Sequence, residues 1–464
     1  MAKTKVKPNW ADPATTAENE ILPRYFKWAW TSRGVSLAIN VILVGYLTYY
    51  CTDMLGMKAA LVGTLLLASK VFDGVTDLIV GFIIDKTNTK FGKARPYEIC
   101  IILVWLLTIL MYSTPNLGTV GKSVFIFILY TLINSVCATF LNGGDAVYLA
   151  HSVRSEANRV SVMSFNGGII MIFSMVLGMI LPQMIAGIGS TKAGWTVIAA
   201  SIGIPFAIIG ILRFIFVKEV VQTESNKANR TVRTVPFKTA LSCVVKNKYM
   251  WILSGMTFVV GMTSGVSAVN TYYFKYIMGN IGLASLISMS NLVTPIVMLI
   301  FPALSRKFGT VTLLKAGAAL GVIGYGIRII GGKNLVTLIA GSVIGTVAVL
   351  PIGLMTNIYM IDVMDYGEWK TGIRVEGMLG SIKSFSSKLS NGLASGMVGF
   401  IMGLTGYDGN LAVQSVSANV SIIALFNYVP LVLMIVLLLL AIIYKLDKEL
   451  PTIKAELEAK HRGN

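Results

Sequence analysis

The sequence predicts an all-α polytopic membrane protein with twelve transmembrane helices in two pseudo-symmetric six-helix halves. Of its 464 residues, 55% are hydrophobic and only 13% are charged, and the mean hydropathy is +0.73. Soluble domains carry about 25% charged residues, so the chain is too apolar for that class. Apolar runs of about 20 residues, the length that crosses a bilayer as a helix, recur along the whole chain.

Twelve such runs are separated by polar connections, and each predicts one membrane helix. They begin near Val35, Leu61, Tyr97, Val124, Val160, Trp195, Trp251, Leu283, Val311, Val336, Met378 and Ile422. Glycine and proline interrupt several runs, for example at Pro205, Pro295 and Pro351. A membrane helix tolerates such residues where neighbouring groups satisfy its backbone.

The basic residues lie mainly in alternate connections. The formal net charge is +18, but Lys and Arg form short clusters after the second, fourth, sixth and eighth runs. This pattern is typical of membrane topology and indicates no nucleic-acid partner. We expect the protein to lie in a bacterial cell membrane, with both termini and the central loop on the cytoplasmic side. The expected organisation is an N-terminal segment (1–32), a six-helix bundle (33–217), a central loop (218–249), a second six-helix bundle (250–446) and a cytoplasmic tail (447–464).

The two expected halves share a short sequence echo. KTNTKFGKARP follows the second run, and SRKFGTVTLLKAG follows the eighth. Two such halves are the plan of a major-facilitator transporter, whose substrate site lies near the midplane between them. The four cysteines lack metal-ligand spacing, and the sequence contains no HExxH, GxSxG or Walker pattern. We therefore expect a transporter and not an enzyme, with no cofactor.

The segment from Lys70 to Pro96 carries two acidic residues inside an apolar run. Asp73 and Asp77 lie four residues apart and share one face of a helix. A carboxylate at the centre of a membrane helix costs roughly 2.5–3.5 kcal/mol, so the pair implies a partner or a function. Lys70, three residues before Asp73, is one such partner. The residues alone leave open a structural ion pair or a cation site.

Three segments resemble signature segments of a known transporter family. They are YYCTDMLG (Tyr49 to Gly56), LVGTLLLASKVFDGVTDLIVGFIIDKTNTKFGKARP (Leu61 to Pro96) and IDVMDYGEWKTGIRVEG (Ile361 to Gly377). They are similar to the glycoside-pentoside-hexuronide:cation symporters, typified by the melibiose carrier. The resemblance extends from about Arg24 to Lys448. It implies a secondary active transporter of the major facilitator superfamily that imports a sugar with Na⁺ or H⁺ by alternating access.

For the cation, the resemblance implies that Asp73 and Asp77 supply carboxylate oxygens, with Thr76 on the same helix and Thr139 on the fourth helix nearby. Na⁺ is a hard cation that requires several oxygen ligands, whereas a proton needs one carboxylate of suitable pKa. The carboxylate pair serves either ion, so the sequence does not choose between them. Lys70 is compatible with both, because it can neutralise the empty site.

For the sugar, the resemblance places Asn142 where the melibiose carrier has a sugar-binding aspartate. Asp145 follows three residues later and Tyr148 continues the same face of the fourth helix. Asp145 is either a displaced substrate carboxylate or a member of a helix-helix ion pair. The tryptophans that stack on a sugar correspond to Ala146 and Gly353, so this is not a melibiose pocket.

The first helix offers basic and amide groups in place of a second sugar-binding aspartate, whose position is occupied by Leu37. Arg33 and Asn40 share one face of that helix, and Lys388 matches the family's intramembrane lysine. A guanidinium pairs well with a carboxylate, so we expect an acidic sugar slightly more than a neutral glycoside. The alternative for Arg33 is an interfacial arginine whose long side chain reaches the membrane surface.

A candidate coupling and gate set combines Lys70, beside the expected cation site, with charged residues at the predicted cytoplasmic surface. Its members are Lys70, Asp85, Arg95, Arg159, Asp362, Asp365, Glu368 and Arg374. The connection between the tenth and eleventh expected helices is DYGEWKTGIRVEG (365–377). Ion pairs between this connection and Arg95 or Arg159 would close the inner gate. The alternative is a solvated turn whose exposed charges contribute little.

The sequence thus predicts a sugar:cation symporter that imports a glycoside or hexuronide. Its expected partners are a small sugar, a monovalent cation and the lipid bilayer, and we expect it to work as a monomer. The alternative is a symporter of lysolipid-like amphiphiles on the same scaffold, because distant relatives of the family move lysolipids.

Overall fold

The computed structural model describes residues 9–12, 15–16, 18–87, 89–220, 242–373 and 376–462. Within its helices, the side chains at 71, 74, 75, 77, 78, 81, 82, 85, 86, 146, 156, 302, 357, 376–385, 388 and 460–462 are not described. The described residues are almost entirely helical. Their one β contact is an isolated bridge between Thr89 and Gly92.

Every one of the twelve predicted membrane helices has a helical counterpart, so the predicted fold class is confirmed. Among the described residues, nine helical segments are long and apolar enough to cross a membrane. Two shorter apolar helices, at Ala59–Lys70 and Leu389–Leu404, and helix α4 account for the others.

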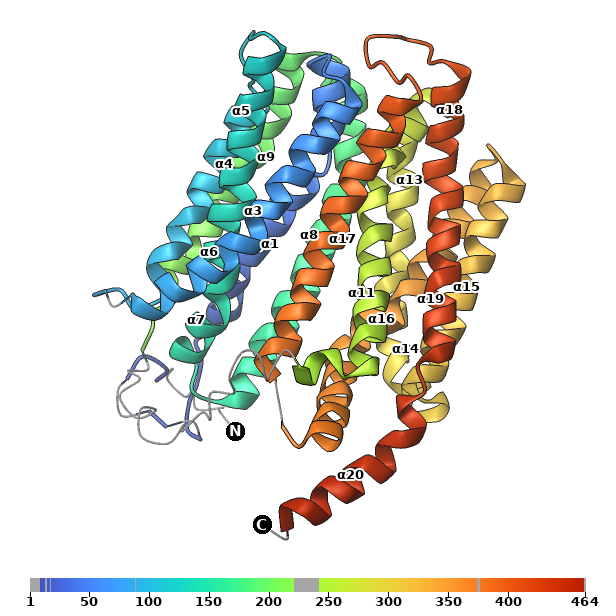
Figure 1. The fold of residues 1–464 in the computed structure, drawn as a ribbon. Helices are drawn as coiled ribbons and strands as arrows, with labels where there is room; N and C mark the ends of the chain where they lie inside the picture. Colours follow the sequence, from blue (N-terminus) through green and yellow to red (C-terminus); the bar gives the residue numbers. More distant parts are fainter. Residues whose placement is uncertain are drawn as a thin grey trace, which may run out of the picture. The chain divides into compact units, whose positions relative to one another are not determined.

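The structure divides into two compact units. The first comprises residues 1–57 and 68–231. Its helices are α1 (Phe26–Val44), α2 (Leu47–Tyr49), most of α3 (Ala59–Lys86), α4 (Cys100–Met111), α5 (Thr119–Thr131), α6 (Thr139–Gly143), α7 (Asp145–Ser152), α8 (Glu156–Ile188) and α9 (Lys192–Phe216). Within it, α1 packs along α8 and α9, and α4 packs along α9 (Figure 1). Buried tryptophans from three of these helices, Trp30, Trp105 and Trp195, fill its interior.

The second unit comprises residues 58–67 and 232–464. Its helices are α11 (Lys248–Val266), α12 (Asn270–Tyr272), α13 (Ala284–Ser288), α14 (Val293–Phe308), α15 (Thr310–Gly331), α16 (Leu335–Thr371), α17 (Glu376–Leu404), α18 (Val416–Ile423), α19 (Val429–Ile443) and α20 (Leu446–Arg462). Within it, α15 packs along α16 and α19, and α11 packs along α17.

Residues 58–67, which include the first residues of α3, belong to the second unit. A Cβ atom added at Gly399 of α17 would lie 2.5 Å from the carbonyl oxygen of Ala59. One added at Gly63 would lie 2.8 Å from the carbonyl oxygen of Gly396. Small residues therefore allow the backbones of these helices to approach closely, as in other membrane helix pairs.

Helical segments with other hydrogen-bond spacings lie between several α-helices. Among the described residues, four are π-helical: η1 (Tyr50–Met54), η3 (Leu132–Ala138), η6 (Tyr273–Ile277) and η9 (Ala424–Tyr428). The described 3-10 segments are η2 (Arg95–Ile99), η5 (Ser267–Val269), η7 (Ile281–Leu283) and η8 (Met289–Leu292). Short π-helical turns are frequent at functional sites. Segment η3 contributes to the candidate cation site, because it carries Ser135 and is followed directly by Thr139.

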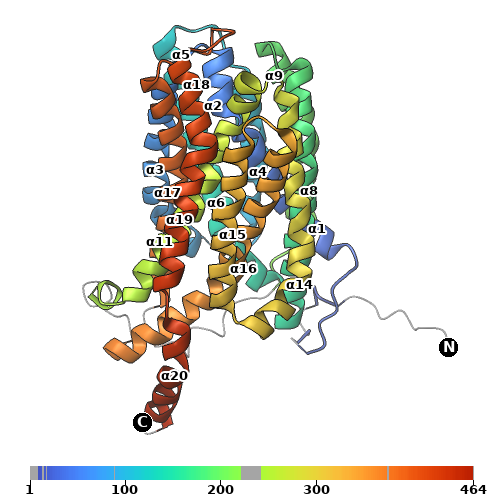
Figure 2. The same cartoon turned by 90° about the vertical axis from the view of Figure 1, so that its right-hand side faces the viewer.

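The C-terminal helix α20 is amphipathic and packs against α16 (Figure 2). Its Ile453 and Leu457 side chains are buried in the core of the second unit. The predicted tail is thus an ordered helix of this unit and extends its core beyond α19.

Candidate cation and substrate sites

Asp73 is the centre of a buried polar cluster between α3 and the pass formed by α5 and η3. Its side chain is only 7% exposed. One carboxylate oxygen accepts a hydrogen bond from the ammonium of Lys70 at 2.9 Å. The other accepts a hydrogen bond from the hydroxyl of Ser135. Ser135 also donates to the carbonyl oxygen of Ser69 at 3.3 Å, so carboxylate, hydroxyl and carbonyl oxygens converge at this point.

Lys70 is held on the same face of α3 as Asp73. Its ammonium lies 5.6 Å from the centroid of the Tyr130 ring, in addition to its pairing with Asp73. The predicted Lys70–Asp73 ion pair is therefore present. It neutralises a carboxylate that would otherwise be costly inside a membrane helix.

The other predicted cation ligands have different surroundings. The hydroxyl of Thr76 donates to the carbonyl oxygens of Phe72 and Asp73, at 3.1 and 3.2 Å. Thr139 is buried and donates to the carbonyl oxygen of Asn134 at 3.2 Å. Asp77 lies in α3, but its side chain is outside the described part of the structure. The coupling roles of these residues stay predictions.

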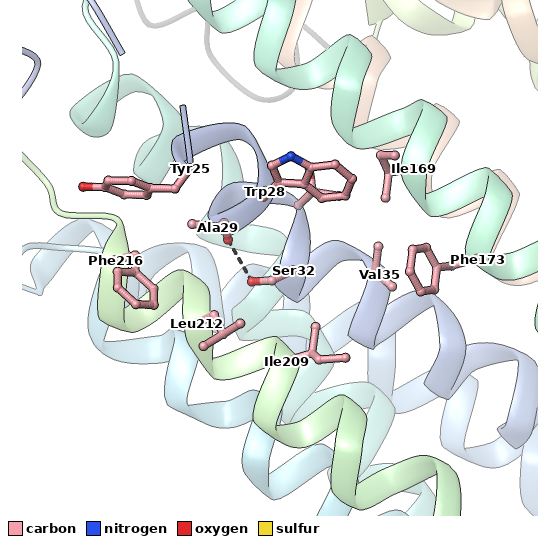
Figure 3. Close-up of a pocket in the computed structure, with 11 residues that line it drawn as sticks. Tyr25, Trp28, Ala29, Ser32, Val35, Ile169, Phe173, Ile209, Leu212 and Phe216 are labelled. Atoms are coloured by element: carbon pink, nitrogen blue, oxygen red, sulfur yellow. Dashed lines mark hydrogen bonds between the residues drawn. The ribbon is translucent and has the colours of Figure 1, made fainter. Parts of the chain in front are cut away.

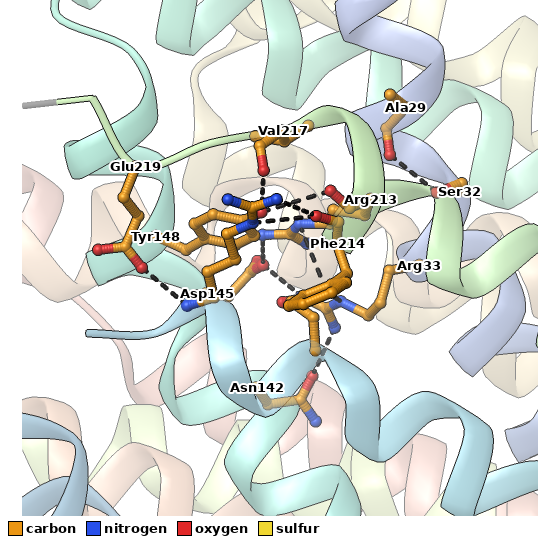
Figure 4. A network of polar contacts seen from close by, with 12 residues as sticks. Ala29, Ser32, Arg33, Asn142, Asp145, Tyr148, Arg213, Phe214, Val217 and Glu219 are labelled. Carbon is orange, nitrogen blue, oxygen red and sulfur yellow. Dashed lines mark hydrogen bonds and ion pairs between the residues drawn. The ribbon is translucent and has the colours of Figure 1, made fainter. Parts of the chain in front are cut away.

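Four charged residues form a second buried cluster in the first unit, which we call the charge network: Arg33, Glu98, Asp145 and Arg213. Arg33 of α1 and Arg213 of α9 both donate to Oδ1 of Asp145, and the Arg213 bond is 2.6 Å long (Figure 4). Both guanidinium groups also lie near Glu98 of η2, with Nε–Oε2 distances of 3.6 and 3.7 Å. Two positive and two negative charges thus balance within one cluster.

The network is closed on one side and open on the other. Arg33, Glu98 and Arg213 are 4, 3 and 1% exposed, whereas Asp145 is 29% exposed. The guanidinium of Arg213 also stacks on the Trp30 ring, 3.5 Å from its centroid. Buried charges are stable only when they are paired. Asp145 is therefore the member of the network that presents a carboxylate edge outward.

Asp145 thus takes part in a helix-helix ion pair, and its predicted contact with the substrate stays a prediction. The same geometry places Arg33 in an internal pair, so Arg33 is not an arginine that extends to the membrane surface. Asn142 accepts a long contact of 3.5 Å from Arg33 and is itself exposed. Asn142 and Asp145 therefore lie together at the open side of the network.

Two other predicted substrate residues face internal partners. Asn40 is buried and donates to the hydroxyl of Thr108 at 2.8 Å. Tyr148 is fully buried and donates to the carbonyl oxygen of Val217 at 2.8 Å. Lys388 lies in α17, with its side chain outside the described part. Substrate contacts of these three residues stay predictions.

The turn that follows α3 binds a carboxylate that the sequence did not single out. Glu219 accepts hydrogen bonds from three successive backbone N–H groups, those of Lys93, Ala94 and Arg95, at 2.9, 2.8 and 2.7 Å. It also contacts Nδ1 of His151 at 3.0 Å. Burial disfavours the charged form of Glu219, but the hydrogen bond to His151 and the three N–H donors outweigh it and lower its pKa.

The predicted gate residues have partners within their own units. Arg95 donates to the carbonyl oxygen of Phe214 through Nε and Nη2, at 2.9 and 2.8 Å. Arg159 donates to the carbonyl oxygens of Val153 and Ala150. Asp85 lies in α3 with its side chain outside the described part, and Arg374 is not among the described residues.

In the second unit, the acidic end of α16 meets the C-terminal helix. Lys454 of α20 lies 3.4 Å from Asp362 and 3.9 Å from Asp365. Trp369 donates to Glu456 at 2.5 Å, and Glu368 is half-buried on the same helix. The gate function predicted for these residues stays a prediction, and Lys454 is a partner that the sequence analysis did not identify.

Several residues of the two buried clusters were not predicted from the sequence, because no clear pattern marks them. Arg213 in GILRFIF and Glu98 in RPYEICII are single charges at the edges of apolar runs, and an opposite pair of this kind is a usable signal for a buried contact. Ser135, four residues before Thr139, had no distinguishing pattern, because hydroxyl residues are common in membrane helices.

Comparisons with known proteins agree with the predicted family. The family model described as MFS/sugar transport protein matches residues 35–448. The isoprimeverose transporter of Lactiplantibacillus pentosus is 29% identical, covering 97% of this chain and 94% of its own. A putative glycoside/cation symporter of Escherichia coli K12 is 26% identical and covers 90% of both chains. The glucuronide carrier protein homolog of the same bacterium is 26% identical, covering 90% of this chain and 91% of its own.

Proposed function

Because the chain belongs to the MFS/sugar transport protein family, we propose that it is a secondary active transporter that imports a sugar together with Na⁺ or H⁺. The observation that carries the proposal is Asp73, a buried carboxylate in a membrane helix with Lys70 and Ser135 as its partners. The names of its relatives, an isoprimeverose transporter and a glycoside/cation symporter, support sugar and cation as the two cargoes. They give no support to a lysolipid-like substrate.

The coupling step we propose takes place at Asp73. With no cargo ion, the ammonium of Lys70 balances this carboxylate. An entering Na⁺ or proton takes over that balance and releases Lys70. Oxygens of Asp73 and Ser135, with the carbonyl oxygen of Ser69, offer the hard ligands that Na⁺ prefers. A proton would instead reside on Asp73 itself.

For the sugar, the geometry favours a neutral glycoside over the acidic sugar that the sequence favoured. The guanidinium of Arg33, which was expected to hold an anion, is already paired with Glu98 and Asp145, and the same two carboxylates pair with Arg213. The groups left at the open side of the network are the amide of Asn142 and the carboxylate edge of Asp145. Both accept hydrogen bonds from sugar hydroxyls, whereas the carboxylate repels an acidic sugar.

Counterflow in proteoliposomes tests the proposal. Proteoliposomes that contain the purified protein are loaded with one unlabelled sugar at a time. Entry of the same sugar in labelled form is then followed with and without Na⁺ and at two pH values. We expect exchange of a neutral glycoside that is accelerated by Na⁺ or by acid. Exchange of hexuronides alone would refute the neutral class but leave the transporter assignment intact. Exchange of none of the sugars would refute the assignment itself.

A further inference from the structure

An apolar groove lies in the first unit between α1, α8 and α9 (Figure 3). Its volume is about 300 Å³. Rings of Tyr25, Trp28, Phe173 and Phe216 surround it, and the remaining lining is aliphatic except for Thr31 and Ser32. The hydroxyl of Ser32, one of its few polar groups, donates to the carbonyl oxygen of Ala29 at 2.8 Å.

The groove starts at the ends of its helices and extends inward. Tyr25 precedes the first residue of α1, and Phe216 is the last residue of α9. Val35 of α1 lies ten residues farther along, about 15 Å at 1.5 Å per residue. One end of the groove is therefore at an interfacial position, marked by the aromatic residues typical of a membrane boundary, and the other lies at the depth of the acyl chains.

The surface around the groove is apolar as well. Trp28, Ile172, Ile208 and Ile215 of its three helices are 58, 49, 62 and 50% exposed. On a membrane helix these side chains contact hydrocarbon. An apolar cavity of this kind does not retain water, and leaving it empty would forfeit dispersion contacts along its walls. Lipid acyl chain is abundant around a membrane protein and fits such a groove.

Basic residues lie close in sequence to the outer end of the groove, which we call its mouth. Arg24 and Lys27 adjoin the mouth residues Tyr25 and Trp28 along the chain, and Lys218 follows Phe216 by two residues. Arg24 and Lys218 are exposed. The acidic residues nearest in sequence are already engaged. Glu20 accepts from the backbone N–H groups of Arg154 and Ser155, and Glu219 is bound in the turn described above. The charge at this end therefore complements an anionic headgroup.

We propose that this groove binds one anionic phospholipid of the surrounding membrane, with an acyl chain between α1, α8 and α9 and the phosphate near Arg24 and Lys218. The lipid is a bound structural ligand and not a transported substrate. The proposal does not depend on the identity of the sugar or of the coupling ion.

Native mass spectrometry on the full-length protein in detergent tests this site. Phosphatidylglycerol and phosphatidylethanolamine with identical acyl chains are titrated separately. We expect one tight phosphatidylglycerol per protein. The double substitution Arg24→Gln/Lys218→Gln should weaken its binding by about 25-fold, at about fivefold for each cation. Leu212→Trp should also displace the lipid, because it fills the groove from α9.

Two matched variants control for general effects. Arg306→Gln/Lys307→Gln removes two exposed basic residues of the second unit, and Val432→Trp adds an indole to the exposed side of α19. Both should bind phosphatidylglycerol as the unaltered protein does, and thermal unfolding checks that all variants are folded. Equal binding of the two lipids, equal loss in the control variants, or no retained lipid would each refute the site.

Discussion

Asp73 and Asp145 are both aspartates inside apolar helices, yet their surroundings differ. Among the side chains that the structure describes, Asp73 has one cationic partner, Lys70, and a hydroxyl partner, Ser135. Asp145 is fixed by two guanidinium groups and belongs to a balanced cluster of four charges. A carboxylate with one exchangeable partner is suited to binding and releasing a cation, whereas one held by two arginines is suited to fixing helices in place.

The first prediction concerns Asp73. Asp73→Asn removes the charge but keeps the size, so cation-driven sugar accumulation should be abolished while sugar counterflow partly survives. Uptake and counterflow in the same proteoliposomes separate the two effects. Asp408→Asn, in an exposed loop of the second unit, is the matched control and should accumulate sugar normally. Accumulation by Asp73→Asn would show that the coupling ion binds elsewhere.

The second prediction concerns the charge network. Arg213→Gln leaves Glu98 and Asp145 with one guanidinium in a buried setting, and breaking such a pair costs about 3–5 kcal/mol. Thermal unfolding of the purified protein in detergent should show a markedly lower midpoint. Asp145→Asn added to the same protein should recover part of the loss, because both partners are then neutral. Simple additivity of the two losses would contradict the pairing.

At the scale of elements, the turn after α3 shows how one local conformation organises several segments. Gly92 has a φ of +116°, and a Cβ atom there would lie 2.4 Å from the carboxyl carbon of Glu219. The three N–H groups that follow it form a concave anion site of the kind made by successive backbone amides. Glu219 thereby ties the end of α9 to the beginning of η2.

The third prediction follows from that turn. Gly92→Ala places a side chain at a left-handed backbone position, at a cost of about 1–2 kcal/mol, and pushes Glu219 out of its site. The purified protein should unfold at a lower temperature. Gly187→Ala, at a helical glycine where the added Cβ has nothing within 4 Å, is the control and should not lower the midpoint. An unchanged midpoint in Gly92→Ala would exclude the tight turn.

The fourth prediction is the pH dependence of the Glu219 contact. The pKa of Glu219 is lowered in the folded protein, so its stabilising contribution is complete above the ordinary pKa of about 4.3 and is lost as the pH falls through the folded value. At pH 7, Glu219→Gln should therefore lower the free energy of unfolding by about 1–3 kcal/mol and with it the unfolding midpoint. The difference from the unaltered protein should vanish at strongly acidic pH. A difference that is constant with pH would mean that the charge of Glu219 contributes nothing.

The helices and the site differ in how far the sequence could predict them. Apolar runs predicted all twelve helices, because the bilayer imposes both length and composition on each span. Asp73 and Lys70 were found because charges are rare inside such runs. The partners Ser135, Glu98 and Lys454 were not found, because pairing across helices depends on rotation and depth that a single run does not reveal. The acidic-sugar expectation rested on Arg33, whose pairing with Glu98 and Asp145 could not be read from the sequence.

At the scale of the whole molecule, the charges determine how transport responds to voltage. One Na⁺ or proton entering across about 100 mV gains roughly 2.3 kcal/mol, equivalent to about fiftyfold accumulation of a neutral sugar. A monoanionic sugar that moves with one cation carries no net charge and gains nothing from the potential. The voltage dependence of uptake therefore distinguishes a neutral sugar, the class that the charge network favours, from an acidic one.

The fifth prediction is that an imposed inside-negative potential strongly stimulates uptake of the neutral glycoside at one-to-one stoichiometry. The measurement is initial uptake in proteoliposomes with a potassium diffusion potential, with stoichiometry taken from parallel ion and sugar fluxes. Asp73→Asn should lose this stimulation, because no cation then crosses with the sugar. Uptake that ignores the potential at one-to-one stoichiometry would mean that the substrate carries a compensating negative charge. The acidic-sugar hypothesis would then be correct, and the anion would have to be held by groups other than the paired Arg33 and Arg213.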